Sequence, residues 1–170
     1  STYTPVADID SVELTNGDGD IVTASWFYRK VDVTQDFEVT YVYTPSGDIA
    51  ADGITLAWQN EGTSALGQTG GYLGYVGIPG NKAAYQMNLY DGHTIGTNFV
   101  TDDSSMEYNT TGAVNINSGN PINVQLSYDA VANTMSERLL DMTSGALFET
   151  VYGEVDLPGL LGDSAYIGFT

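Results

Sequence analysis

Cysteine is absent from the 170 residues of this chain. Disulfide bonds, metal sites built from thiolates and a cysteine nucleophile are therefore excluded. Also absent is any apolar run near the roughly 20 residues that a membrane-spanning helix needs. No basic segment followed by an apolar one, as in a signal peptide, is present either. These absences predict that the chain does not insert into a membrane.

Basic residues are scarce, with 4 lysines and arginines against 22 aspartates and glutamates and a formal net charge of −18. Such a surface repels phosphate backbones and anionic lipid headgroups, so nucleic acid is not expected as a partner. Divalent cations and neutral sugars stay compatible with it. The acidity also suits solubility in a salty or extracellular medium, where ions screen the self-repulsion. A hydrophobic content of 42% excludes a disordered acidic tail.

The groups that catalysis requires are not arranged as pairs or motifs. His93 is the only histidine, no serine motif accompanies it, and no glycine-rich phosphate loop with lysine is present. Glu137 and Asp141 lie four residues apart, which on a strand separates them by roughly 13 Å. That distance is too large for the carboxylate pair of a retaining glycosidase. We therefore predict a non-catalytic protein.

Short segments of alternating apolar and polar residues run through most of the chain, separated by clusters of glycine, asparagine, aspartate and proline. This period is typical of strands with one buried face, and no long helical period competes with it. The length suits a single domain over residues 1–170. We predict an all-β domain of about ten to twelve strands in two stacked antiparallel sheets. Strands are expected at 10–15, 21–29, 37–44, 54–59, 83–90, 122–128, 134–140, 147–152 and 165–169.

Polar clusters predict the turns between these strands. Residues 16–20 (NGDGD) would join 10–15 to 21–29 as a hairpin. The same letters also fit the start of a calcium loop, although the glutamate that closes an EF-hand is missing. Residues 44–48 (TPSGD) would turn the chain toward Asp52, and residues 1–8 form a short polar approach to the first strand.

Glu137 conflicts with the pattern of its own strand. It shares one face with Met135 and Leu139, so a carboxylate would be buried among apolar side chains. A buried carboxylate without a partner costs several kcal/mol. Three solutions stay open: an ion pair with Arg138, a β-bulge, or a register shifted by one residue.

The stretch ADGITLAWQN over residues 51–60 joins a carboxylate to a strand. Asp52 precedes Gly53, which lets the backbone turn sharply and leaves the carboxylate at the rim of a sheet. A simple turn is the alternative, because Asp-Gly pairs are common turn formers. A second stretch, GGYLGY over residues 70–75, follows a polar loop.

The order of these motifs resembles the L-type, legume-lectin-like family, in particular its bacterial versions in large secreted or surface proteins. The resemblance runs from near Leu14 to the end and includes the segments 25–28, 37–41, 51–53, 70–74, 84–90, 124–129 and 166–170. It implies a concanavalin A-like jelly-roll sandwich of two antiparallel sheets. It also implies a carbohydrate-binding module with an extracellular or cell-surface location. The start at Ser1, without methionine, fits either a processed chain or a domain excised from a larger protein.

The resemblance also assigns candidate site residues. Asp52, after a peptide bond that is cis in the family, would accept hydrogen bonds from sugar hydroxyls. A backbone N–H near Gly71 would donate one, and Tyr72 or Tyr90 would stack on the sugar ring. Asn88 completes the predicted carbohydrate site.

The metal sites of the family are altered in this sequence. Gln86 and Asn88 stand where the family usually has a glutamate and an aspartate, and neutral amides attract cations poorly. We expect no transition metal there and at most a weak calcium site, formed by Asn88, the Tyr90 carbonyl and Asp91. Gly92 replaces the sugar-binding asparagine of the family, and His93 is expected to be a solvated loop residue.

A second functional class stays open beside the lectin-like one. Without metal and sugar sites, the domain would be a structural, adhesive or self-assembling surface module. The resemblance implies one more strand before Leu14 and another after Phe169. We expect either a parent chain to supply them or a neighbouring copy to pair edge to edge, involving Asp10–Thr15 and Ala165–Phe169.

Overall fold

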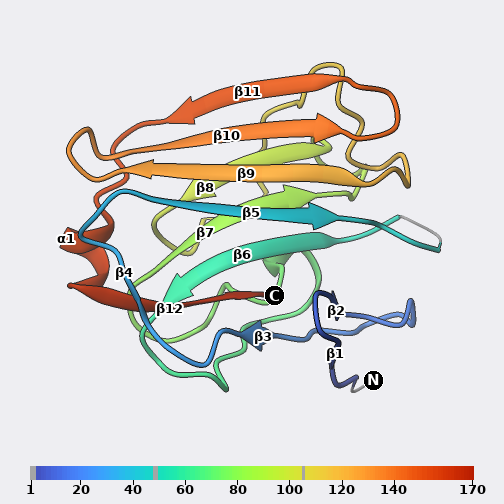
Figure 1. The fold of residues 1–170 in the computed structure, drawn as a ribbon. Coiled ribbons are helices and arrows are strands. Elements are labelled where there is room, and N and C mark those ends of the chain that lie inside the picture. Colours follow the sequence, from blue (N-terminus) through green and yellow to red (C-terminus); the bar gives the residue numbers. More distant parts are fainter. Residues whose placement is uncertain (1–2, 48–49, 105) are drawn as a thin grey trace.

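The computed structural model describes residues 3–47, 50–104 and 106–170. Residues 1–2 of the predicted N-terminal approach and Asp48 of the predicted 44–48 turn lie outside the described residues. Twelve strands and one short α-helix, α1 (Leu157–Leu161), are present in the described ranges, and most strands belong to two stacked antiparallel sheets (Figure 1). No helix in these ranges is both long and apolar enough to cross a membrane.

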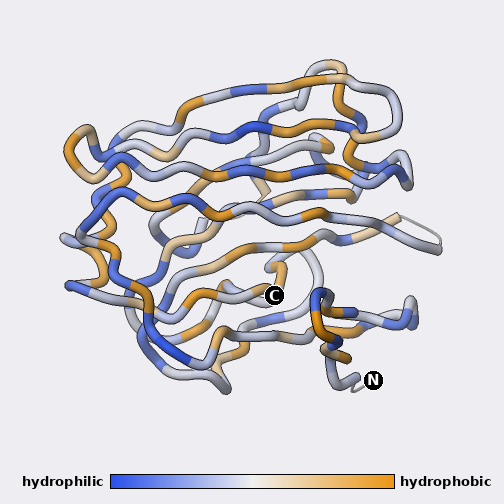
Figure 2. The backbone as a smooth tube through the Cα atoms, viewed as in Figure 1, coloured by the Kyte–Doolittle hydropathy of each residue, from blue (hydrophilic) through white to orange (hydrophobic). Residues whose placement is uncertain are grey.

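One sheet has four strands, and its alternating sequence pattern is reproduced as alternating burial. Along β9, every second side chain from Ile122 to Tyr128 is buried, and along β5 every second side chain is exposed. Figure 2 shows the same alternation of hydrophobic and hydrophilic positions along these strands. The predicted strands 37–44 and 122–128 are thus confirmed. The order is β11 (Leu147–Tyr152), β10 (Thr134–Asp141), β9 (Ile122–Asp129) and β5 (Phe37–Tyr43).

The other sheet is covered on both faces. Its inner face forms the main core with the four-stranded sheet, centred on Trp58, Tyr85 and Leu126. Its outer face lies under the loop of residues 61–80, where Tyr75 and Ile78 form a second apolar cluster. The order is β3 (Ser25–Trp26), β12 (Ser164–Phe169), β6 (Gly53–Gln59), β7 (Lys82–Asn88) and β8 (Gly96–Val100), with β4 (Val31–Asp32) also paired to β12.

The predicted hairpin between 10–15 and 21–29 is wrong. Instead, β2 (Val12–Glu13) pairs with β1 (Val6–Ala7), and β3 pairs with β12. In the described residues, the bond from the Thr23 hydroxyl to the Leu14 carbonyl, at 2.8 Å, joins the two segments. Trp26 instead pairs with Gly168 of β12, and its Nε1 donates to the Ala65 carbonyl in the loop of residues 61–80 at 2.8 Å.

Glu137 faces the core, so the expected register is right. An uninterrupted ladder joins β10 to β9 and β11, which excludes a bulge, and Arg138 pairs with Glu149 instead. The buried Glu137 carboxylate is satisfied by hydrogen bonds from three hydroxyl groups. Tyr85 donates to one carboxylate oxygen at 2.7 Å, while Thr97, at 3.0 Å, and Tyr152 donate to the other. Burial raises the pKa of Glu137, and these three bonds oppose the rise.

The predicted open edge at Ala165–Phe169 is also wrong. This segment is β12, which pairs on one side with β6 and on the other with β3 and β4. The four-stranded sheet has two edge strands among the described strands: β5, which pairs with β9 alone, and β11, which pairs with β10 alone.

Candidate functional site

Three loops meet at one end of the six-stranded sheet, where β6 begins and β7 ends (Figure 1). Gly53 pairs with Asn88 across these strands, and the Leu89 N–H donates to the Asp52 carbonyl at 2.9 Å. The loop that contains Gly70 reaches the same place, because a Cβ added to Gly70 would lie 3.9 Å from the Asp52 carboxylate. The fold thus brings together the segments around Asp52, Gly71 and Tyr90.

Asp52 lies at the rim of the sheet, as predicted. The Ala51–Asp52 peptide bond is cis, which confirms the expectation for this position. Gly53 is required next to it, because a Cβ there would lie 2.1 Å from the Met87 carbonyl oxygen. The half-buried Asp52 carboxylate receives no hydrogen bond from any described residue. It is therefore able to accept hydrogen bonds from a ligand.

The second loop contains the short 3₁₀ helix η1 (Gly70–Tyr72). Hydrogen bonds hold this loop on the six-stranded sheet: the Leu73 carbonyl accepts from the hydroxyl of Thr55 in β6, at 3.0 Å, and from that of Thr170 after β12, at 2.7 Å. Within the described residues, no group accepts a hydrogen bond from the Gly71 N–H. The Tyr72 side chain is 40% exposed, so it is accessible for stacking.

Two neighbours of this loop were missed from the sequence. The Met106 side chain lies against Gly71, because a Cβ on Gly71 would be 3.1 Å from the Met106 methyl carbon. Tyr108 lies near Asp52; burial raises the pKa of Tyr108, and the Asp52 charge adds to the rise. Both residues come from the loop after β8, and no local motif links that loop to Asp52.

The third loop is organised by Asn88. Its amide nitrogen donates to the carbonyls of Tyr90, at 3.0 Å, and Thr94, at 2.9 Å. Its amide oxygen accepts from the Tyr90 N–H at 3.3 Å. Asn88 is buried and its amide forms hydrogen bonds within the loop, so the side chain fixes the conformation of residues 88–94.

Tyr90 and His93 lie on the surface of this loop. The Tyr90 side chain is 42% exposed, and its ring covers Gly92, where a Cβ would come within 2.3 Å of a ring carbon. The His93 ring packs against it at a centroid distance of 5.8 Å, in an edge-to-face arrangement. His93 is exposed, as expected for a solvated loop residue.

Gln86 and Lys82 extend the same face of β7 and bind the loop after β8. The Gln86 amide nitrogen donates to the Tyr75 hydroxyl at 2.6 Å and to the Ser104 carbonyl at 2.7 Å. The Lys82 ammonium lies 2.8 Å from the Asp103 carboxylate. In the described ranges, no group of three or more histidine or carboxylate side chains is placed to hold a metal ion.

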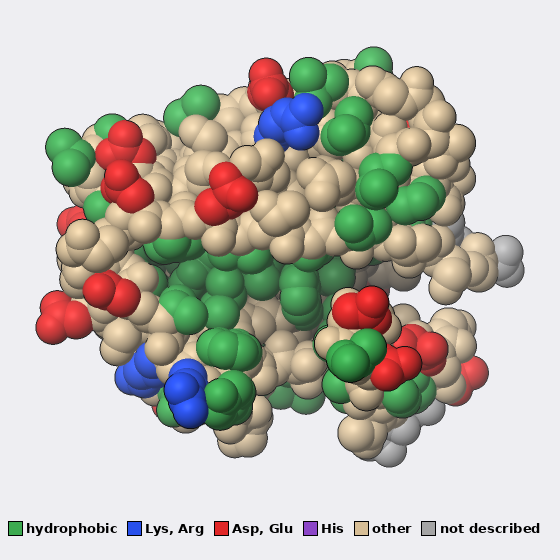
Figure 3. All heavy atoms as spheres, in the orientation of Figure 1, with side chains coloured by type: hydrophobic (Ala, Val, Ile, Leu, Met, Phe, Trp, Pro, Cys, Tyr) green, Lys and Arg blue, Asp and Glu red, His purple; other side chains and the backbone are tan. Residues whose placement is uncertain are grey.

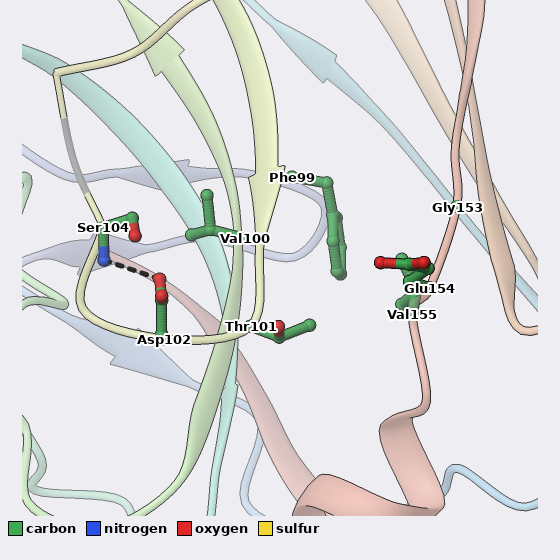
Figure 4. A pocket seen from close by; sticks show the side chains of 8 residues that line it. All are labelled: Phe99, Val100, Thr101, Asp102, Ser104, Gly153, Glu154 and Val155. Atoms are coloured by element: carbon green, nitrogen blue, oxygen red, sulfur yellow. Dashed lines mark hydrogen bonds between the residues drawn. The ribbon is translucent and has the colours of Figure 1, made fainter.

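A separate cleft of about 240 Å³ lies beside the end of β8 and the loop that follows it (Figure 4). Phe99 and Thr101 lie between the Asp102 and Glu154 side chains, which come from the loop after β8 and from the segment before α1. None of the predicted site residues lines this cleft.

The two carboxylates considered for catalysis are both engaged elsewhere. Glu137 is enclosed by hydroxyls in the core. Asp141 accepts bonds from the Asn120 amide at 2.9 Å and from the Thr143 and Ser144 backbone at 2.8 and 2.9 Å. These bonds hold the pKa of Asp141 well below its usual range. Asp141 therefore stabilises a turn.

No protein-family model matches the chain. Among solved structures, it is similar to the lectin from Bauhinia forficata in complex with GalNAc, with a TM-score of 0.76 and 15% identity over 97% of this chain and 81% of the lectin. The chain is also similar to the basic winged bean lectin with Tn-antigen, with a TM-score of 0.72 and 19% identity over 97% of this chain and 78% of that lectin. For lectin I-B4 from Griffonia simplicifolia, in a metal-free form, the TM-score is 0.71 and the identity 16%, over 97% of this chain and 81% of that lectin. The chain thus has the fold of the legume lectins, a concanavalin A-like jelly-roll sandwich of antiparallel sheets.

Proposed function

We propose that this protein is a non-catalytic carbohydrate-binding module of a secreted or cell-surface protein. The observation that carries the proposal is the meeting of three loops around the Asp52 carboxylate, which no described residue engages. The structural neighbours include a lectin in complex with GalNAc and one in complex with methyl-α-D-galactose, which supports a neutral sugar as the ligand class. The acidic surface, with few lysines and arginines (Figure 3), is compatible with such ligands.

The loops supply the contacts that a sugar needs. A sugar hydroxyl would donate to the Asp52 carboxylate, and another would accept from the Gly71 N–H. Tyr72 and Tyr90 expose rings that stack on the apolar face of a pyranose. Met106, next to Gly71, adds an apolar contact and limits the space on that side.

Replacing Asp52 by asparagine is expected to weaken binding of a glycan about 10- to 100-fold. The side chain keeps its size but loses the charge-assisted hydrogen bond, which contributes roughly 1.5 to 3 kcal/mol. A glycan array identifies the ligand, and calorimetry with wild type and variant measures the change. Asp163→Asn is a matched control, because Asp163 is exposed and precedes β12 at the end of the sheet opposite to Asp52. Equal affinity of Asp52→Asn and wild type for every bound glycan rules out the role of Asp52.

The alternative proposal is a self-assembling or structural surface module, and the open edge of β5 favours it. Side chains such as Phe37, Val39 and Tyr41 pack against the main core but stay half-buried. Figure 3 shows hydrophobic side chains gathered in the hollow beside this edge, below the four-stranded sheet. An unpaired strand beside apolar surface is a template for pairing with another strand.

For this alternative we expect a concentration-dependent dimer in light scattering. The β5 amides that point away from β9 would then exchange hydrogen slowly in the dimer and quickly on dilution, with the interior strand β9 as the internal reference. A monomer at all concentrations with fast exchange of these outward-pointing β5 amides eliminates the assembly module and leaves the glycan proposal untouched.

A further inference from the structure

We infer that N–H donors on the outer face of β7 hold the binding loops of this chain at the positions where the family resemblance implies metal ligands, so that the loops are ordered without a divalent metal. The inference refines the proposed function in one respect, since glycan binding would then be independent of metal. The donors are the side chains of Lys82, Gln86 and Asn88.

The arrangement at Asn88 is the opposite of a cation site. A calcium ion needs oxygen lone pairs that converge on one point. Here the Tyr90 and Thr94 carbonyls converge on the Asn88 NH₂ group, at 3.0 and 2.9 Å. The remaining Asn88 oxygen is taken by the Tyr90 N–H. The amide therefore supplies the positive partner that the two carbonyls require, and it is covalently part of the chain.

Gln86 repeats this arrangement two residues earlier. Its NH₂ group donates to the Ser104 carbonyl and the Tyr75 hydroxyl, and Tyr75 itself donates to the same carbonyl. The Gln86 oxygen is buried and accepts no bond from the described residues. One neutral oxygen does not offset the dehydration of a divalent cation.

A charged donor, Lys82, anchors the loop after β8 at the other end of this face of β7. Lys82 is 4% exposed and carries the only charge among the alternating side chains Lys82, Ala84, Gln86 and Asn88. Its partner Asp103 is engaged by this ammonium and by the Gly77 N–H. The loops of residues 89–94 and 101–104 are thus both anchored to β7 by N–H donors of that strand. Gln86 and Asn88, which stand where the family resemblance implies metal ligands, therefore do not fit a metal here.

The test compares thermal unfolding in EDTA, in millimolar CaCl₂ and in millimolar MnCl₂. For the wild type we expect the same melting temperature in all three buffers, and elemental analysis without stoichiometric manganese, zinc or calcium. A melting temperature that falls in EDTA, or calorimetry that shows one calcium bound with micromolar or tighter affinity, overturns the inference.

Asn88→Asp tests the role of the amide itself. The variant loses both N–H donors and turns a carboxylate toward two carbonyls, so we expect its melting temperature in EDTA to fall by roughly 4 to 8 °C. Asn123→Asp is the matched control, because it makes the same charge change on β9 in the other sheet. A melting temperature of Asn88→Asp equal to that of the control contradicts the inference. If Asn88→Asp does not fold, the wild-type comparison still decides.

These readouts need no sugar, so they separate the two proposals. Absence of glycan binding in every buffer would defeat the proposed function and leave the loop inference standing. Glycan binding that disappears in EDTA would support the proposed function and defeat the inference.

Discussion

Replacing Glu137 by alanine is expected to lower the free energy of unfolding by roughly 3 to 5 kcal/mol. The carboxylate accepts hydrogen bonds from Tyr85, Thr97 and Tyr152, which come from three different strands in the two sheets. Its removal leaves buried hydroxyls without an acceptor and opens a cavity between the sheets. Urea unfolding followed by fluorescence measures the loss. Glu149→Ala is the control, because Glu149 is exposed and pairs with Arg138 at 3.3 Å.

The same carboxylate makes stability depend on pH, and Glu137→Gln isolates its contribution. Burial raises the pKa of Glu137 in the folded state above its ordinary value, while the tyrosines around it have raised pKa values and stay protonated. As pH rises from the ordinary pKa to the raised one, the unfolded chain releases its proton first. The free energy of unfolding of the wild type therefore falls over this window, relative to Glu137→Gln, and then stays constant. A wild type that gains stability relative to the variant over the same window contradicts this assignment.

The second large effect is expected for Gly53→Ala. A Cβ at this position would lie 2.1 Å from the Met87 carbonyl oxygen and 3.2 Å from the Asn88 Cα, both backbone atoms of the neighbouring strand. The clash is relieved only by separating the start of β6 from the end of β7, at a cost of roughly 3 kcal/mol. The same movement carries Asp52 away from the other two loops. We therefore expect loss of stability together with loss of glycan binding.

Gly19→Ala is the matched control, since a Cβ there meets no atom within 4 Å. Thermal unfolding and glycan calorimetry on both variants distinguish a local effect from a general glycine effect. If Gly53→Ala unfolds at the wild-type temperature and binds normally, then β6 and β7 are not held together at this point.

The strands were predictable where one face is exposed. In β9 and β5 the alternation of side chains along the sequence matches the alternation of burial, because solvent on the outer face requires polar residues. The position of Asp52 at the start of β6 also followed from local sequence, through the glycine after it. The strand alternation and the position of Asp52 were predictable because both are determined by residues adjacent in the sequence.

Pairings between distant segments were not predictable in the same way. The 16–20 cluster indicates a turn but not which strands pair, and the Trp26 strand joins β12, near the other end of the chain. Glu137 was identified as a conflict, yet its solution required hydroxyls from β7, β8 and β11. Met106 contacts Gly71 only because the loop after β8 folds back over η1.

The two tryptophans of the chain lie in different apolar clusters, and this gives each cluster its own optical reporter. Trp58 is fully buried between the two sheets, close to Phe37 and Phe99. Trp26 packs against the cluster under the loop, and its indole N–H is bonded to the loop carbonyl of Ala65. A variant that retains Trp26 alone emits from beneath the loop of residues 61–80, and one that retains Trp58 alone emits from the sandwich interior. Their emission spectra therefore separate loosening of the loops from separation of the sheets within one unfolding experiment.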